Sequence, residues 1–413
     1  MSALSSHSTG ISSNHLSEET PVSASVASRF DTIDLLRGLS ILGVMLLHVR
    51  NWLSTGKVEP GGSLPPWLRY DLFNQGGNGV SAFFAISGFL ITFISIRRFG
   101  ALETLRVSTF YRIRFARIAP LLLLLLLILG VLHWTGSPAF HIKPEQGSLA
   151  GALFAALTFQ LNWYEAVHGF LPPAWTVLWS LSVEEMFYLF FPVVCVALLR
   201  QRWSRPLFFL VLGGLIVFGP FARTPWYSPN DLWLYQSYLG NLDNIALGCL
   251  FGLLTAHLDR QGLFVRARWP LLCQILGAAL ILFIVNWIWP KTFLGWPMKR
   301  ALGRSGTDVT ILGLGVCLIM LGSVLRRKRG SRWTAPLRWL GRYSYEIYLS
   351  HVFVVIAVIS LFLTVRRGPL IAWVMASVLL SAALGCLLSR FFSEPANRLL
   401  RGAPVPAQLP ENR

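Results

Sequence analysis

The chain has 413 residues, of which 54% are hydrophobic and only 13% are charged. A soluble domain carries about 25% charged residues, so this composition excludes a soluble globular enzyme, a disordered protein and a secreted disulfide scaffold. The mean hydropathy of +0.57 indicates an integral membrane protein instead. The formal net charge of +18 then fits basic cytoplasmic loops better than a nucleic-acid partner.

Ten apolar runs predict membrane-crossing helices, since about 20 apolar residues span a bilayer. They are Ile33–Trp52, Gly77–Ile96, Ile113–Trp134, Trp175–Leu199, Leu207–Phe221, Ser237–Leu258, Pro270–Trp289, Asp308–Leu325, Tyr343–Leu363 and Leu370–Phe392. An eleventh run, Leu149–Trp163, is shorter and predicts a re-entrant or interfacial segment between the third and fourth helices. Residues 1–30 are rich in Ser and Thr and lack an apolar core, which predicts a disordered tail rather than a signal peptide.

The basic residues predict the orientation. With the N-terminus in the cytoplasm, 25 of the 36 Lys and Arg fall in inner segments, as the positive-inside rule requires. We therefore expect an all-α polytopic membrane protein of about ten transmembrane helices over residues 31–398, with both termini cytoplasmic. Residues 399–413 are expected to form a short cytoplasmic tail.

The five cysteines do not suggest a metal site. They lie in apolar runs without paired or metal-like spacing, so we interpret them as small buried hydrophobes. They are Cys195, Cys249, Cys273, Cys317 and Cys386.

The first apolar run carries two ionisable residues, Arg37 and His48. They are eleven positions apart, which is three helical turns plus about 20°, so both lie on one face, roughly 16 Å apart along the axis. That face offers an anion-binding group at one end and a base at the other. The alternative is that Arg37 reaches lipid headgroups and His48 makes a helix contact.

Arg114 and Arg117 are three residues apart and share a helical face at the start of the third run. Arginine forks bind phosphates bidentately, and ordinary cytoplasmic anchoring is the alternative. In the second run, Ser87 and Gly88 favour close helix packing over a nucleophilic serine.

Glu184 and Glu185 are adjacent in the fourth run. A carboxylate in a membrane helix costs free energy, so its presence needs a reason. The side chains of these two residues point about 100° apart, so they cannot act as a facing pair. Asp243, Glu346 and His351 also lie within runs, and each is interpreted as structural rather than catalytic.

Several motifs, in order along the chain, resemble the membrane-bound acyltransferase-3 family of bacterial envelope O-acyltransferases. The motifs are Asp34, Arg37, Gly38 and His48; Gly79-Val80 and Phe84–Thr92; Arg114 and Arg117; Trp179–Tyr188; Tyr343–His351; and Ser393-Glu394-Pro395. Met186 and Ser350 depart from the family pattern, where Gln and Trp are common. The fused periplasmic SGNH-type domain of many relatives is also expected to be missing, so transfer would finish on this chain or pass to a partner.

The resemblance implies an O-acyltransferase in the bacterial inner (plasma) membrane, which uses acyl-CoA, normally acetyl-CoA, and no metal. Its implied acceptor is a hydroxyl of an envelope polysaccharide or another glycoconjugate. Arg114 and Arg117 would hold the donor's phosphates, and Arg37 would guide the thioester inward. His48 would act as the base or carry the acyl group briefly, and Glu184 would orient or balance a site group.

Two other functions explain the polar residues within the membrane runs. A proton-coupled transporter or flippase of a related glycan would use Arg, His and Glu as a relay. A structural partner of a polysaccharide assembly complex would not need His48 at all. The release of CoA from acyl-CoA distinguishes an acyltransferase from both.

Overall fold

The computed structural model describes residues 31–61, 64–227, 230–262, 268–286 and 301–401. The predicted tail over residues 1–30 and most of the one over 399–413 lie outside these ranges. Within them, all regular structure is helical. The long helices are α2 (Asp31–Thr55), α4 (Gly76–Phe99), α5 (Val107–His133), α9 (Leu178–Leu199), α10 (Arg205–Ala222), α12 (Leu239–Gln261), α13 (Trp269–Asn286), α15 (Thr307–Arg326), α17 (Ser344–Val365) and α18 (Leu370–Leu388).

Short helices connect or cover the long ones. They are α3 (Pro66–Phe73), α6 (Leu149–Leu157), α7 (Leu161–His168), α8 (Pro173–Thr176), α11 (Asp231–Gln236), α16 (Ala335–Arg342) and α19 (Glu394–Arg401), with the single turns η1 (Pro144–Gln146), η2 (Arg332–Thr334) and η3 (Ser389–Ser393).

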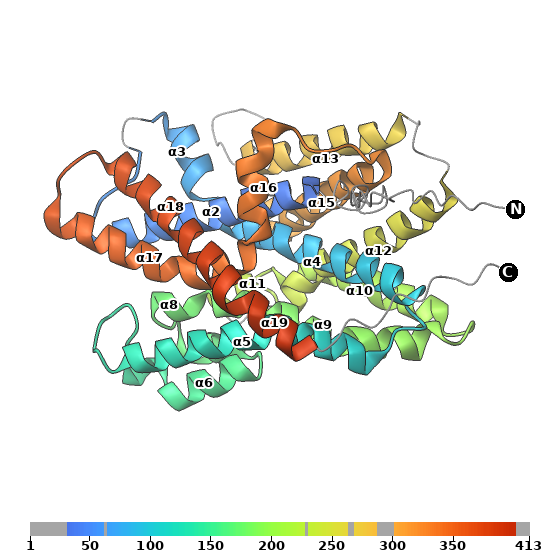
Figure 1. Ribbon diagram of the computed structural model, residues 1–413, viewed down its shortest axis with the longest axis horizontal. Coiled ribbons are helices and arrows are strands. Elements are labelled where there is room, and N and C mark those ends of the chain that lie inside the picture. Colours follow the sequence, from blue (N-terminus) through green and yellow to red (C-terminus); the bar gives the residue numbers. More distant parts are fainter. Residues whose placement is uncertain (1–30, 62–63, 228–229, 263–267, 287–300, 402–413) are drawn as a thin grey trace, which may run out of the picture.

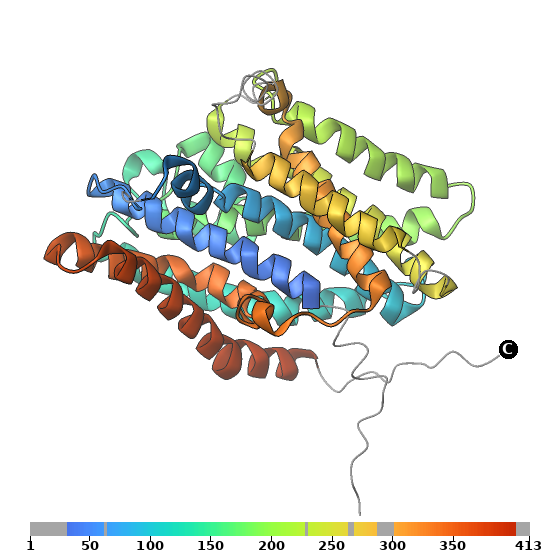
Figure 2. The same cartoon turned by 90° about the horizontal axis from the view of Figure 1, so that it is seen from above.

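Most of the long helices run roughly along one direction, which gives the bundle two ends (Figures 1 and 2). In the described part of the chain, nine helical segments are long and apolar enough to cross a membrane. The chain is therefore a multi-pass membrane protein. The predicted run Pro270–Trp289 forms α13, whose apolar stretch Trp269–Val285 is shorter than those of the nine. The last three residues of that run lie outside the described ranges.

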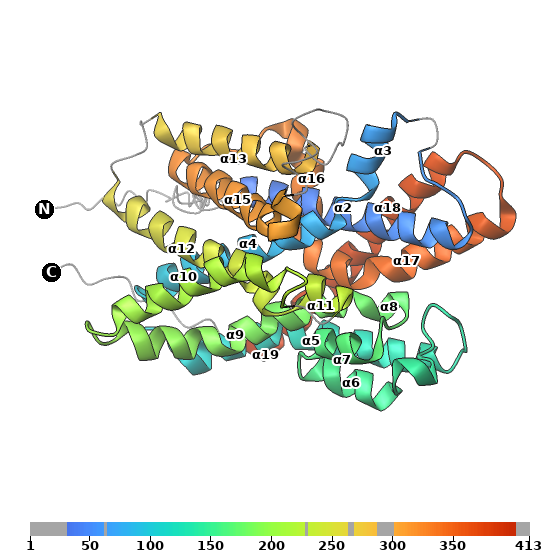
Figure 3. The same cartoon turned by 180° about the vertical axis from the view of Figure 1, so that it is seen from behind.

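The short eleventh run forms two helices rather than one. The chain turns between α6 and α7, where Phe159 adopts a left-handed conformation with φ of 57°. A helix of nine residues is about 13 Å long and cannot cross a hydrocarbon core of about 30 Å. Both helices lie beside α5 and α9 at one edge of the bundle (Figure 3). That they enter the membrane and return stays a prediction.

Helix α4 lies at the centre of the bundle, where it contacts α2, α9, α12 and α15. Its contact with α12 is made backbone to backbone. A Cβ at Gly88 would lie 2.0 Å from the carbonyl oxygen of Ile245, and one at Gly248 would lie 2.2 Å from that of Ala85. Small residues permit this approach in membrane helices, and the resulting contact fixes the wall from which Ser87 projects.

A saturated ion pair joins α10, α12 and α15 away from this wall. Arg223 and Asp243 form two parallel hydrogen bonds of 3.0 and 2.8 Å, and their side chains are only 7% and 0% exposed. Thr310 Oγ1 donates to Asp243 Oδ2 over 2.5 Å, and Arg223 also donates to the carbonyl of Gly306. Asp243 is thus structural, as expected from the sequence.

The last helix is set apart from α18 by a π-helical turn, η3, over Ser389–Ser393. Such turns change the register of a helix and re-aim the residues after them. Beyond this turn, α19 packs against α5 (Figure 1).

Candidate functional site

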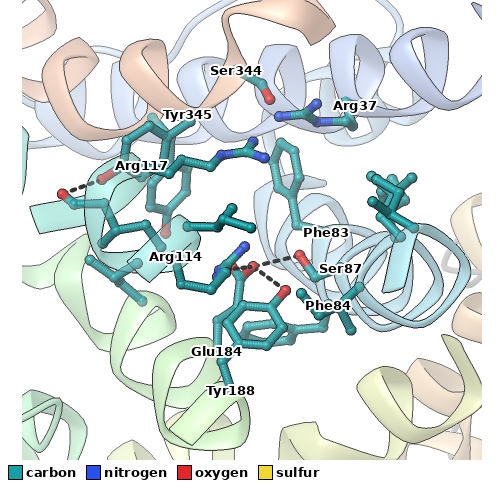
Figure 4. A pocket seen from close by; sticks show the side chains of 18 of the residues that line it. Arg37, Phe83, Phe84, Ser87, Arg114, Arg117, Glu184, Tyr188, Ser344 and Tyr345 are labelled. Atoms are coloured by element: carbon teal, nitrogen blue, oxygen red, sulfur yellow. Dashed lines mark hydrogen bonds and ion pairs between the residues drawn. The ribbon is translucent and has the colours of Figure 1, made fainter. Parts of the chain in front are cut away.

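A cavity of about 330 Å³ is enclosed by helices α2, α4, α5, α9, α17 and α19. Figure 4 shows the side chains that project into it. Five arginines and a single carboxylate, Glu184, are among its described lining residues; the arginines are Arg37, Arg98, Arg114, Arg117 and Arg401. This excess of positive charge makes the cavity a site for an anion.

Glu184 accepts two hydrogen bonds inside the cavity. Ser87 Oγ on α4 and Tyr188 Oη, one turn along α9, each donate to Glu184 Oε1 over 2.7 Å. Ser87 is therefore more than a packing residue, which the sequence did not reveal because its partner lies 97 positions away. Two donors fix the carboxylate of Glu184 in one orientation.

Glu185 turns from the cavity and binds the third apolar run. Its Oε1 accepts a 2.7 Å hydrogen bond from Arg114 Nη2, which also lies 3.7 Å from Glu184 Oε1. The guanidinium of Arg114 stacks 3.7 Å from the centre of the Tyr188 ring. Arg114 is thus held in place by two carboxylates and an aromatic face.

Arg117 differs from Arg114 although both line the cavity. It is exposed and makes no ion pair within the described ranges. Arg37 likewise has no ion-pair partner there, and it reaches toward Arg117 across the cavity (Figure 4). The charge of Glu346 interacts with both arginines, but no described carboxylate forms an ion pair with either, which leaves room for a negatively charged group.

His48 does not line the cavity and instead meets a second histidine. Its ring lies edge-on to that of His351 on α17, with centroids 5.0 Å apart. His351 in turn lies beside Tyr348, a lining residue whose hydroxyl is 2.6 Å from Ser180 Oγ at the inner end of the cavity. The ring contacts of His351 thus connect His48 to Tyr348 of the cavity lining.

The hydrogen bonds of His351 assign its tautomer. Its Nδ1 lies 2.8 and 3.1 Å from the carbonyl oxygens of Tyr348 and Ile347, which only accept, so Nδ1 carries the proton. Its Nε2 keeps a lone pair, is shielded from solvent and has no hydrogen-bond partner. The sequence interpretation of His351 as merely structural missed this orphan acceptor. Its place at the end of the Tyr343–His351 motif was the available signal.

No group of three or more His, Cys, Asp or Glu that would hold a metal occurs among the described residues. All five cysteines are free, and Cys195, Cys249 and Cys317 are buried in helices, as small hydrophobes are.

Comparison with known proteins decides the family. Residues 30–390 match the acyltransferase domain of the acyltransferase-3 family. The chain belongs to this family. The O-acetyltransferase OatA of Staphylococcus aureus strain NCTC 8325 is 23% identical over 92% of the chain and 59% of its own length. A putative O-acetyltransferase of Staphylococcus aureus strain COL is 28% identical over 42% of the chain and 26% of its own length.

This acyltransferase-3 chain therefore spans about three fifths of the length of the OatA sequence that it matches. No solved structure matches it. The predicted family membership is confirmed, and with it the presence of an acyltransferase domain.

Proposed function

We propose that this protein is an O-acetyltransferase of the bacterial inner membrane, which moves an acetyl group from acyl-CoA to a hydroxyl of an envelope polysaccharide or exported glycoconjugate. The observation that carries the proposal is the arginine-lined cavity, whose lining residue Tyr348 lies beside His351 of the His48–His351 pair. CoA is a polyanion with a long, narrow thioester arm, so it matches a site with cations at one end and a base beyond the other.

In this proposal Arg117 and Arg37 bind phosphates or guide the arm, because neither guanidinium is neutralised by an acid within 4.0 Å in the described ranges. Arg114 contributes less free charge, since Glu185 and Glu184 already surround it. Glu184 is held by Ser87 and orients a polar group of the donor or acceptor.

His48 is proposed as the general base. The acceptor hydroxyl gives its proton to His48 while its oxygen attacks the thioester carbonyl; the carbon–sulfur bond then breaks, and the thiolate of CoA takes up the proton. His351 Nε2 offers an acceptor for one N–H of His48. That contact would leave the second ring nitrogen of His48 unprotonated, as a base requires.

The test follows CoA release from acetyl-CoA by purified protein in nanodiscs, with and without candidate glycan acceptors. His48→Ala is expected to lower the rate by roughly 100-fold or more while the melting temperature stays near that of the wild type. The control is His257→Ala, because His257 is exposed near the end of α12 and does not line the cavity. Full activity of His48→Ala would exclude His48 as the base, and acyl-CoA binding without any CoA release would favour a transporter.

A further inference from the structure

The open end of the cavity carries three arginines from three different helices. Arg98 closes α4, Arg117 lies near the start of α5, and Arg401 is the last described residue of α19. The first two are exposed, and Arg401 is half-buried. The charge of Arg401 interacts with those of both Arg98 and Arg117, so the three form one cluster.

None of the three arginines has an ion-pair partner within the described ranges, although the charges of Glu185 and Glu346 interact with Arg117. The Nε of Arg401 is shielded from solvent and has no hydrogen-bond partner. Holding like charges together costs free energy, and a shielded N–H without an acceptor adds to that cost. A bound anion with several acceptor oxygens removes both penalties.

Arg398, the other arginine of α19, is an example of an arginine that does not contribute to the cavity. Arg398 is 84% exposed, lies 3.6 Å from Glu394 on its own helix and does not line the cavity. Three residues separate it from Arg401, yet only Arg401 turns inward. The π turn η3 and the packing of α19 on α5 set this orientation.

Arg401 comes from a part of the chain that lies after the matched acyltransferase domain, which ends at residue 390. The cavity wall is thus completed by a helix that begins in the motif Ser393-Glu394-Pro395 and lies past the matched residues. Deeper in the cavity, Ser87, Glu184 and Tyr188 present hydroxyl and carboxylate groups. These three groups can bond a polar arm, whereas much of the remaining lining is apolar.

We propose that Arg98 and Arg401 complete, with Arg117, a binding site for the phosphate groups of a nucleotide thioester, and that α19 closes the mouth of the donor cavity. The inference rests on the proposed function, which names acyl-CoA as the donor. It adds two binding residues and assigns the terminal helix to donor recognition.

The experiment measures the affinity of full-length protein for CoA in nanodiscs of zwitterionic lipid. Arg401→Ala and Arg98→Ala are each expected to weaken CoA binding about tenfold or more, because a charged hydrogen bond is lost. Arg398→Ala is the matched control and is expected to bind CoA within about twofold of wild type. Arg401→Lys should recover part of the loss, and melting temperatures report whether each variant is folded.

CoA without its 3′-phosphate shows which phosphate the cluster binds. We expect it to bind wild type more weakly than CoA does, and to lose less affinity on Arg401→Ala. If wild type binds CoA but Arg98→Ala and Arg401→Ala behave like Arg398→Ala, the inference is wrong and the proposed function stands. If wild type binds no CoA or acyl-CoA, the proposed donor itself fails.

Anionic nanodiscs separate the nucleotide from a lipid headgroup, which carries the same phosphate chemistry. Affinity for CoA should persist when phosphatidylglycerol is added, apart from general charge screening. Displacement of CoA by this lipid in wild type, with no such displacement in Arg401→Ala, would assign the cluster to a headgroup and overturn the inference.

Discussion

Two groups of arginines lie inside this membrane protein, and their surroundings are opposite. Arg223 is fully paired: Asp243 accepts two of its hydrogen bonds, and the Gly306 carbonyl accepts another. In the cavity, Arg37 and Arg117 face each other, and neither has an ion-pair partner in the described ranges, although the charge of Glu346 interacts with both. A saturated buried charge serves the fold, whereas an unsaturated one is held ready for a ligand.

Arg114 combines features of both groups. It lines the cavity, yet it donates a 2.7 Å hydrogen bond to Glu185, whereas Arg223 donates two, of 3.0 and 2.8 Å, to Asp243. Substitution of an arginine that stabilises the fold should lower the melting temperature, and substitution of one that binds the ligand should lower affinity for the donor. Substitution of Arg114 should do both.

Breaking the saturated pair is expected to have the largest effect on stability. Arg223→Ala leaves the buried Asp243 charged and unpaired, which costs about 3–5 kcal/mol, and thermal unfolding in detergent measures the loss. The double variant Arg223→Met with Asp243→Leu should recover much of it, since no charge is then left without a partner. An unchanged melting temperature for Arg223→Ala would show that the pair is not what joins α10 to α12.

Arg114 and Arg117 sharpen the comparison within one helix. Arg117→Ala is expected to raise the dissociation constant for acyl-CoA about tenfold, because one charged contact is lost, with little change in melting temperature. Arg114→Ala should weaken donor binding and also lower the melting temperature, since Glu185 loses its partner. Should only acceptor affinity fall in both variants, the donor role of this face would be excluded.

The smallest expected effect on stability comes from Glu165, a buried carboxyl that has no arginine partner among the described residues. Glu165 on α7 lies outside the candidate spans, and burial raises its pKa to about 8, while the Leu171 N–H donates to it. The folded protein therefore holds a proton that the unfolded chain releases near pH 4.5, so stability falls as pH rises from about 4.5 to 8.

Glu165→Gln cannot lose that proton. Melting temperatures measured between pH 5 and 8 should therefore decline less in this variant than in the wild type. Parallel declines in the two proteins would show that Glu165 does not carry the pH dependence.

The sequence predicted the helices well because an apolar run of about 20 residues must satisfy its backbone hydrogen bonds within the membrane, and a helix does this within one segment. The family motifs also named four residues that line one cavity: Arg37, Arg114, Arg117 and Glu184. Their roles, and that of His48, stay predictions. The eleventh run forms two short helices, and its re-entrant or interfacial placement stays a prediction; the turn at Phe159 that divides it has no strong sequence signal.

Contacts between distant helices could not be predicted. His48 meets His351 across 303 positions, and Arg114 binds Glu185 across 71. Arg401 fell in the predicted cytoplasmic tail over residues 399–413, because the register change at η3 and the helix that follows it cannot be read from composition. Helical periodicity gives the face of a residue on its own helix, and only packing shows what that face meets.

The Arg223–Asp243 pair also bears on how the chain enters the membrane. The segment containing α12 is the least apolar of the nine candidate spans, with a mean hydropathy of 1.3, and Asp243 contributes to that. A carboxylate costs an isolated membrane helix free energy at insertion, up to about 2.5–3.5 kcal/mol at the helix centre. Arg223 precedes α12 and is synthesised first, so we expect α10 and α12 to insert as a hairpin, with α15 and Thr310 joining afterwards. The Arg223–Asp243 pair that stabilises the fold would then also determine the order in which these helices assemble.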